Sequence, residues 1–113
     1  MKHDEILPEI VELGNAINSK AFNLTRCMLL AIISYFEDGV QFRELKSALN
    51  LSDGKLFSNL HFLIEMDMIQ SNKTRFDNKE IEYYMIAERG KNELEKIVKW
   101  NGKIGKLLGI KNE

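Results

Sequence analysis

The sequence predicts an α+β fold that is mostly α-helical, and the features that predict it lie between residues 40 and 86. An amphipathic segment, Phe42–Leu49, is followed by a polar turn, 50–54, and by a second segment with helical apolar spacing, Lys55–Met68. Two strand-like runs come next, and the turn-forming residues 76–79 separate them. Helix, turn, helix and hairpin in this order make a winged helix-turn-helix, here with additional N- and C-terminal helices.

Two helices are predicted before this unit. Residues 4–19 predict the first, because apolar side chains recur there at helical spacing, namely Ile6, Ile10, Leu13 and Ile17. The second begins at Asn23 or Thr25, ends before Asp38–Gly39, and is apolar over more than half of its circumference, which is typical of a central helix. A short extended piece at Val40–Phe42 is expected to pair with the hairpin.

The helix-turn-helix itself is predicted from turn and cap residues. Asn50 ends the first helix, and the Ser52 hydroxyl is a good N-cap for the second. Within the second helix, Leu56, Leu60 and Leu63 lie on one stripe that is expected to face the core. The opposite side of that helix is then free to meet a partner.

The C-terminal third predicts a hairpin and a long helix. Strands are expected at 69–75 and 80–86, with Asp77–Asn78 at the turn because both residues tolerate left-handed backbone. A helix is expected over 88–110, although its glycines weaken it. Its apolar residues are Ile97, Trp100, Ile104, Leu107 and Leu108.

Composition limits the class of protein. The 113 residues fit a single domain, 1–113, and the net charge of -1 with a pI near 6.1 argues against a protein that coats nucleic acid non-specifically. Such a balance permits sequence-specific DNA binding but does not by itself support it. The single cysteine, Cys27, cannot form an intramolecular disulfide and is expected to be a buried thiol. With no signal peptide and no apolar run of about 18 residues, a cytoplasmic location is expected.

The sequence predicts neither an enzyme nor a metal or cofactor site. No nucleophile motif or phosphate-binding glycine loop occurs, and Cys27 has no neighbouring base. His3 and His61 are far apart and lack other ligands at metal-binding spacing.

The candidate DNA contacts are polar or basic residues on the helix-turn-helix and the hairpin. Short hydroxyl groups and a basic residue near the start of the second helix can reach phosphates and base edges. The predicted set is Arg43, Lys46, Ser52, Lys55, Ser58, Asn59, His61, Lys73, Arg75 and Lys79. The alternative is an ordinary solvated helix face and a soluble hairpin tip. Ser52 has a structural role as a cap, and Asn59 lies near the edge of the core.

Two aromatic residues of the second helix are harder to place. Phe57 and Phe62 flank its outer face, where a large ring is costly unless it packs on something. They are expected to pack within the chain, and the alternatives are a partner subunit or a bound ligand.

The sequence resembles winged-helix transcriptional regulators of the MarR and ArsR type. The likeness rests on Phe42–Leu45, Leu51–Leu56, the following Leu60, Leu63, Glu65 and Ile69, and Ile86–Gly90, and with Asn23 and Arg26 it covers roughly residues 22–98. Asn59 and Ala87 depart from the family pattern, which commonly has His and Thr there. The resemblance implies a dimeric DNA-binding regulator that pairs through its terminal helices.

Together these observations predict a homodimeric, sequence-specific regulator of transcription that acts as a repressor by blocking polymerase at a pseudo-palindromic site in double-stranded DNA. Residues 22–87 are the expected DNA-binding core, and 4–19 and 88–110 are the expected dimerisation helices, because their apolar side chains exceed what one such domain needs to cover itself. The alternative function is a protein–protein adaptor without direct DNA contact, which the net charge favours. A small-molecule effector is not supported by any residue pattern.

Overall fold

The computed structural model describes the backbone of residues 3–110 and the side chains of residues 5–110. It confirms the predicted α+β fold, because helices are combined with one antiparallel hairpin. The elements in chain order are α1 (His3–Asn15), α2 (Leu24–Tyr35), α3 (Phe42–Leu49), α4 (Asp53–Glu65), β1 (Ile69–Phe76), β2 (Lys79–Ile86) and α5 (Glu88–Leu107).

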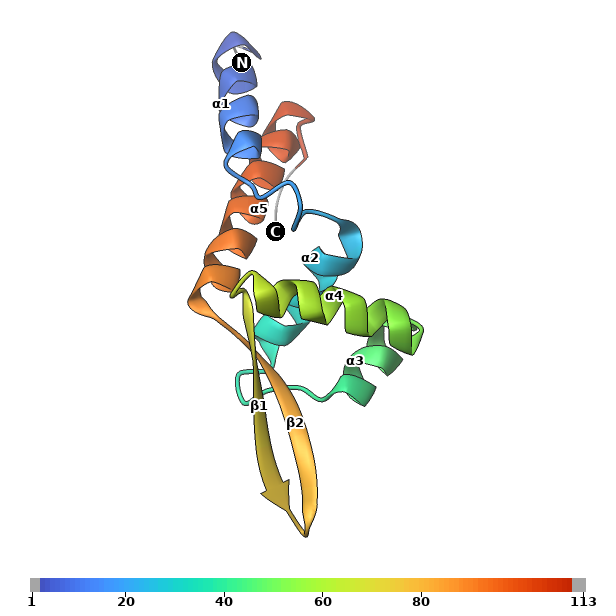
Figure 1. Cartoon of the computed structure of the whole chain (residues 1–113). Coiled ribbons are helices and arrows are strands. Elements are labelled where there is room, and N and C mark those ends of the chain that lie inside the picture. Colours follow the sequence, from blue (N-terminus) through green and yellow to red (C-terminus); the bar gives the residue numbers. More distant parts are fainter. Residues whose placement is uncertain (1–2, 111–113) are drawn as a thin grey trace.

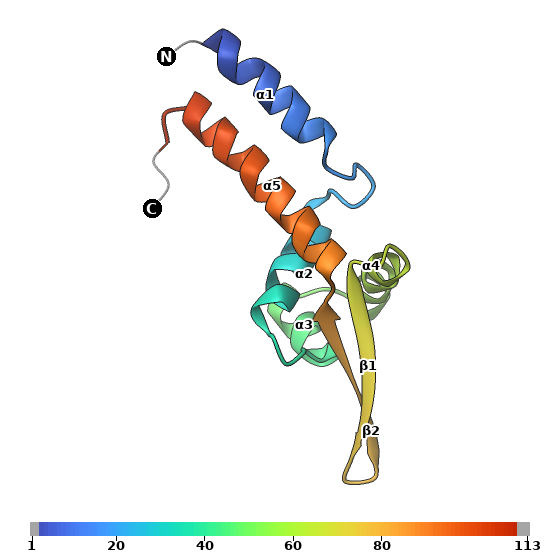
Figure 2. The ribbon, with the colours of Figure 1, turned by 90° about the vertical axis from the view of Figure 1, so that its left-hand side faces the viewer.

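The molecule is elongated, with extents of 62 × 26 × 24 Å. Figures 1 and 2 show α2, α3 and α4 together in the middle, with the hairpin projecting from one side of them. Helices α1 and α5 lie side by side and extend in the opposite direction. We call residues 24–86 the winged core, and we call α1 with the C-terminal half of α5 the helical arm.

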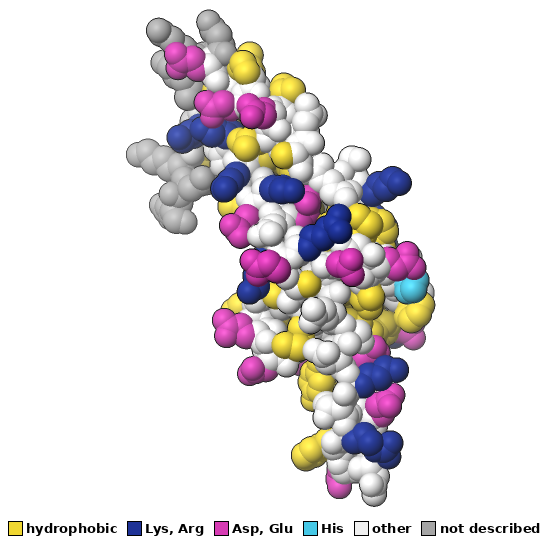
Figure 3. Space-filling model, turned by 60° about the vertical axis from the view of Figure 1, so that its left-hand side comes forward, with side chains coloured by type: hydrophobic (Ala, Val, Ile, Leu, Met, Phe, Trp, Pro, Cys, Tyr) yellow, Lys and Arg dark blue, Asp and Glu magenta, His cyan; other side chains and the backbone are white. Residues whose placement is uncertain are grey.

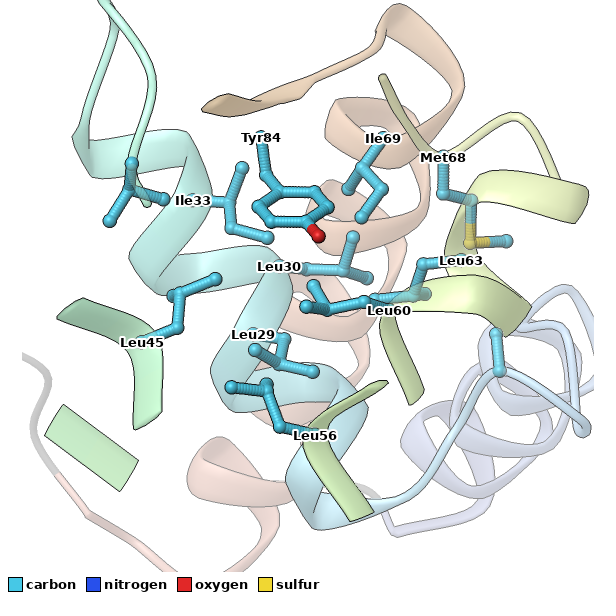
Figure 4. Close-up of a cluster of buried hydrophobic side chains, with 12 residues drawn as sticks. Leu29, Leu30, Ile33, Leu45, Leu56, Leu60, Leu63, Met68, Ile69 and Tyr84 are labelled. Atoms are coloured by element: carbon cyan, nitrogen blue, oxygen red, sulfur yellow. The ribbon is translucent and has the colours of Figure 1, made fainter. Parts of the chain in front are cut away.

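The winged core is held together by one cluster of buried side chains (Figure 4). It joins α2, α3, α4 and the start and end of the hairpin, and its largest members are at most 2% exposed: Leu29, Leu30, Ile33, Val40, Leu45, Leu56, Leu60, Leu63, Met68 and Ile69. The ring of Tyr84 closes the cluster from β2. Burial, together with the adjacent Glu82 carboxylate, raises the pKa of Tyr84 to about 12.

The helix-turn-helix forms as the cap residues predict. The Gln41 N–H donates to Glu44 Oε1 over 3.0 Å at the start of α3, and Asn50 ends α3 in the left-handed conformation with φ 52°. The Ser52 hydroxyl accepts a hydrogen bond of 3.2 Å from the backbone N–H of Lys55. Helix α4 is therefore fixed in direction at its N-terminus.

The hairpin also follows its turn residues. Strands β1 and β2 pair from Ile69 opposite Ile86 to Phe76 opposite Lys79. Asp77 and Asn78, with φ 56° and 65°, form the two-residue turn, which is the backbone geometry that matches strand twist. The expected extended piece is confirmed at Val40, which forms a bridge to Tyr84 through hydrogen bonds of 2.8 and 3.0 Å, whereas Phe42 already belongs to α3.

Three helix ends differ from the predicted ones. Helix α1 stops at Asn15, so Ile17 lies outside it. The cause is Asn18, whose side chain accepts from the N–H groups of Lys20 and Ala21 and whose own N–H donates to Glu93 Oε2 on α5 over 2.7 Å.

Helix α4 ends at Glu65 because the chain turns at Asp67, which has φ 58°, and this turn buries Met68. Helix α5 runs through Gly102 without a break and ends at Leu107, just before Gly109 with φ 73°.

The helical arm is formed by complementary charge and a close aromatic contact. Glu9 of α1 pairs with Lys103 of α5 over 2.6 Å, and this hydrogen bond and charge lower the pKa of the Glu9 carboxyl. The Trp100 ring lies against Gly14, where an added Cβ would stand 3.0 Å from the indole nitrogen, and it meets the Phe22 ring edge-on. A larger residue at position 14 would push this ring away.

Two residues expected at a dimer contact are already covered within one chain. Ile6 and Ile97 are each only 6% exposed, because α1 and α5 pack on one another. A second subunit therefore has little of either side chain left to bury. Of the other residues predicted for that contact, Leu108 is exposed, while Ile10, Leu13, Ile17, Trp100, Ile104 and Leu107 are half-buried.

Candidate nucleic-acid interface

Helix α4 has one side in the core and one side open to solvent. Leu56, Leu60 and Leu63 are at most 1% exposed, whereas Ser58 and His61 on the outer side are exposed. Figure 3 shows the histidine (cyan) at the surface beside exposed hydrophobic side chains. Neither the arm nor the hairpin covers this side, so α4 can approach a groove as a recognition helix.

Ser52 is accounted for by the fold. Its hydroxyl is occupied as the N-cap of α4, so removing it is expected to weaken the helix start whether or not it contacts DNA. Lys55 and Ser58 follow on the exposed side of the first turns, and neither is needed to hold the helix in place.

Asn59 does not lie on the outer face, and its assignment as a base contact is corrected. It is 9% exposed, its Oδ1 accepts from Arg26 Nε over 3.0 Å, and its Nδ2 donates to the Lys55 carbonyl oxygen over 2.8 Å. Arg26 also donates to the carbonyl oxygen of Lys20. The Asn59 amide is thus occupied within the fold. Through Arg26 it joins α4 to the start of α2 and to the loop before it. Its position at the edge of the leucine stripe was the signal for burial.

The two phenylalanines of α4 have different surroundings. The expected packing of Phe62 is confirmed, because the Arg26 guanidinium stands 3.8 Å from its ring centroid. The same expectation is wrong for Phe57, which is 63% exposed. Its ring lies parallel to the His61 ring, with 6.2 Å between centroids and 6° between planes. His61 Nε2 in turn lies 2.6 Å from Glu65 Oε1.

Acidic side chains pair with two of the six lysine and arginine candidates. Lys46 pairs with Asp53 over 2.7 Å, and Lys73 lies 3.8 Å from Glu80. The other four basic candidates form no ion pair with another described residue; they are Arg43, Lys55, Arg75 and Lys79.

The whole segment from residue 42 to 86 is slightly acidic. It has six basic side chains and seven acidic ones. The acidic residues are Glu44, Asp53, Glu65, Asp67, Asp77, Glu80 and Glu82. Phosphate attraction at this face is therefore limited to the unpaired cations.

The hairpin has three basic and three acidic side chains, and the strand register places opposite charges across from one another. Lys73 stands directly opposite Glu82, and Arg75 stands opposite Glu80. Opposite charges at paired positions attract across the strands, which stabilises the hairpin and reduces its field. Lys79, at the tip, is opposite Phe76 instead.

Two grooves lie away from this face. One, of about 480 Å³, runs between α1 and α5 and is lined by Glu9, Glu12, Leu13, Lys99, Gly102, Lys103 and Lys106. Another, of about 420 Å³, lies between α2 and α5 beside Leu94 and Val98. Across residues 3–110, no three His, Cys, Asp or Glu side chains are grouped as a metal ion would require.

Cys27 is half-buried in α2 rather than fully buried. Burial, and after it the negative charge of Glu93, raises the pKa of its thiol, so the reactive thiolate is disfavoured. No helix in the described part of the chain has the length and apolar character needed to cross a membrane.

Comparison with known proteins agrees with this geometry. The sequence matches the profile of a family described as "Winged helix DNA-binding domain" over residues 25–104. No curated protein matches it. The fold is similar to that of MarR, with a TM-score of 0.69 and 17% identity, covering 96% of this chain and 81% of the other.

Two further solved structures have a similar fold. A mutant of MepR from S. aureus, bound to an oligodeoxyribonucleotide, gives a TM-score of 0.69 at 13% identity and covers 96% of this chain and 82% of that one. A transcriptional regulator from Thermotoga maritima gives 0.64 at 18% identity, covering 95% and 78%. At these identities the likeness is one of fold, and it confirms the resemblance to MarR-type regulators at that level.

Proposed function

The chain belongs to the family of winged-helix DNA-binding domains, and from this premise we propose that it is a homodimeric transcriptional regulator that binds a pseudo-palindromic site in double-stranded DNA. The observation that carries the proposal is the open outer face of α4, opposite a fully buried leucine stripe and capped at its start. A family of DNA-binding domains also agrees with the lack of any catalytic motif in the sequence.

In the proposed complex, α4 enters the major groove and the hairpin lies along the adjacent backbone. Ser58 and His61 are the candidate base contacts, since both are exposed on the outer side of α4, although His61 Nε2 would first have to leave Glu65. The cations free to neutralise phosphates are Arg43, Lys55, Arg75 and Lys79. Lys46 and Lys73 contribute less, because each would first have to leave its carboxylate partner.

The proposed dimer forms along the helical arm. Helix α5 carries Leu94 and Val98 beside the groove that it forms with α2, and Gly102 one turn later borders the groove between α1 and α5. Val98 is exposed, and a Cβ added at Gly102 would meet nothing within 4 Å among the described residues. A glycine that the single chain does not need permits close approach of another helix. Pairing there would place two copies of α4 in successive major grooves, about 34 Å apart.

Occupying such a site would exclude polymerase, so repression is the proposed mode of regulation. The adaptor alternative is favoured by one observation, the small excess of acidic side chains between residues 42 and 86. A protein that binds a basic partner through α4 would need no phosphate contacts. The two functions therefore differ in whether duplex DNA binds at all.

Selection from random duplexes tests the DNA proposal. The full chain is incubated with a random library at low salt, bound DNA is amplified, and the enriched site is measured by band shift at two salt concentrations. We expect an inverted repeat and a log–log salt slope of about -7 for a dimer that uses the four free cations of each subunit. Failure to enrich any duplex at low salt would refute DNA binding and favour the adaptor.

Sedimentation equilibrium tests the dimer. Val98→Asp should shift the protein from dimer to monomer, because a charge would be buried in the apolar contact. Leu24→Asp, which alters an equally apolar and more exposed residue of α2, should leave the dimer unchanged. A wild-type chain that remains monomeric at concentrations well above the DNA-binding range would contradict the proposal.

A further inference from the structure

The exposed ring of Phe57 requires a separate explanation. An exposed phenylalanine on the free side of α4 adds nothing to the core, and its apolar surface remains in contact with water. The segment that contains it, residues 42–86, has one more acidic than basic side chain, so phosphate attraction supplies less of the binding free energy than in a basic protein. Contacts to the bases must then carry a larger share, and Phe57 is the largest apolar group available for them.

The ring of Phe57 is restrained by its neighbours on the same helix. It lies against the parallel His61 ring one turn later, and the His61 imidazole is held by the Glu65 carboxylate at 2.6 Å. Residues four apart share one side of a helix, so the three side chains form a continuous row. A restrained ring loses less conformational freedom on binding than a mobile one.

A glycine, Gly54, lies at the exposed start of α4, where a small residue would permit the helix backbone to approach another molecule. Gly54, one turn before Phe57 and Ser58, has no atom within 4 Å of an added Cβ, so the fold of residues 3–110 does not require glycine there. Glycine within a helix is less stabilising than alanine. Its presence at the exposed start of α4 suits a site where the helix backbone lies close to another molecule.

We propose that Phe57 is a specificity-determining residue that recognises the C5-methyl group of a pyrimidine in the major groove. The methyl group of thymine is the apolar mark that distinguishes a T·A pair at that edge, and an aromatic side chain is a suitable contact for it. This inference rests on the proposed function, because it specifies what the same α4 face reads. 5-Methylcytosine presents the same group, so both sources share the required chemistry.

Replacing thymine by deoxyuridine removes the methyl group and leaves base pairing intact. In the selected duplex, each thymine and its symmetry mate are replaced in turn, and affinity for the wild-type chain is measured by band shift. At one symmetric pair of positions we expect binding to weaken by about fourfold for each methyl lost, since burying a methylene-sized group is worth about 0.8 kcal/mol. To test the second source, 5-methylcytosine and cytosine are compared at that position, each paired with guanine.

Variants of the protein assign the effect to Phe57. Phe57→Ala should bind the thymine duplex about as weakly as the wild type binds the deoxyuridine duplex, and it should no longer distinguish the two. Tyr35→Ala is the matched control, because Tyr35 is an aromatic residue at 81% exposure at the end of α2, and this variant should retain full discrimination. Far-ultraviolet circular dichroism shows whether each variant is folded.

The outcomes separate this inference from the proposed function. If no duplex is selected, DNA binding itself fails. If a duplex binds but no deoxyuridine or 5-methylcytosine position alters affinity, the methyl reading is overturned while DNA binding stands. If a methyl-sensitive position exists and Phe57→Ala keeps the sensitivity, another residue reads it, and the assignment to Phe57 is wrong. The deoxyuridine series on the wild-type protein does not depend on any variant folding.

Discussion

The winged core and the helical arm bury their apolar side chains to different extents. In the core, α2, α3 and α4 each contribute side chains that are completely inaccessible, such as Leu30, Leu45 and Leu63. Along α1 and α5, the described apolar side chains that are buried are Ile6 and Ile97, and others on these helices or directly after α5 remain exposed: Leu7, Val11, Val98 and Leu108. The winged core therefore buries its central apolar side chains within one chain, whereas the helical arm keeps exposed apolar surface that a second molecule could cover.

This difference separates what holds the fold from what recognises a partner. Side chains that close the core are missing from the outer face of α4, where the exposed groups are polar, charged or, at Phe57, aromatic. The arm and the outer face of α4 are thus the two surfaces available for a second subunit and for DNA, and each can be altered with little effect on the core. The changes below test that separation.

The largest effect is expected from removing a core side chain. Leu30→Ala should lower the free energy of unfolding by about 3 kcal/mol, because it removes buried methyl groups and leaves a cavity. Leu24→Ala on the same helix alters a residue that is 74% exposed, so it should change the free energy of unfolding by less than about 0.5 kcal/mol. Urea unfolding followed by circular dichroism measures both. A similar loss for Leu24→Ala would mean that a partner covers Leu24.

A smaller effect is expected at the junction between α2 and α4. Asn59→Ala should lower the free energy of unfolding by about 1–3 kcal/mol, because Arg26 Nε loses its partner at a mostly buried site. The neighbouring Ser58→Ala, on the exposed side, should leave stability almost unchanged. The same urea titration distinguishes them. If Ser58→Ala destabilises the protein and Asn59→Ala does not, the outward and inward sides of α4 have been assigned the wrong way round.

The smallest effect is expected from single cations on the DNA-facing side. Lys55→Ala should reduce the salt slope of binding by about one unit per subunit, because it removes one phosphate contact. Lys46→Ala should reduce it by less, since Lys46 is held by Asp53 at 2.7 Å. Band shifts over a salt series compare the two. Equal slopes for both variants would show that the ion pair opens when DNA binds.

The order of elements could be predicted because it depends on local chemistry. Ser52 caps α4 through its hydroxyl, Asn50 and the Asp77–Asn78 turn adopt the left-handed backbone that these residue types tolerate, and all act as expected. The leucine stripe of α4 likewise faces the core as its spacing requires. The ends of α1 and α4 were less predictable, because a contact from Asn18 to the distant Glu93, and the burial of Met68, decide them.

The candidate site was less predictable than the fold. Periodicity places a residue on a side of a helix, but it does not reveal which carboxylate will reach a given lysine. The neutral charge of the hairpin follows from its composition, but the contact of Lys73 with Glu80, which lies diagonal to its register partner Glu82, could not be predicted. Phe57 and Phe62 have equivalent flanking positions in the sequence pattern, and only Phe62 meets a neighbour from another helix.

By itself, the sequence determined the helix-turn-helix, the hairpin and the inward side of α4, because caps, turns and apolar spacing act over a few residues. Only the tertiary structure decided that Asn59 is hydrogen-bonded to Arg26 and that the Phe57 ring stays exposed to solvent. It also decided that Ile6 and Ile97 are covered within one chain. Those outcomes depend on which surfaces meet across long stretches of chain. Contacts between segments distant in sequence leave no mark on local periodicity.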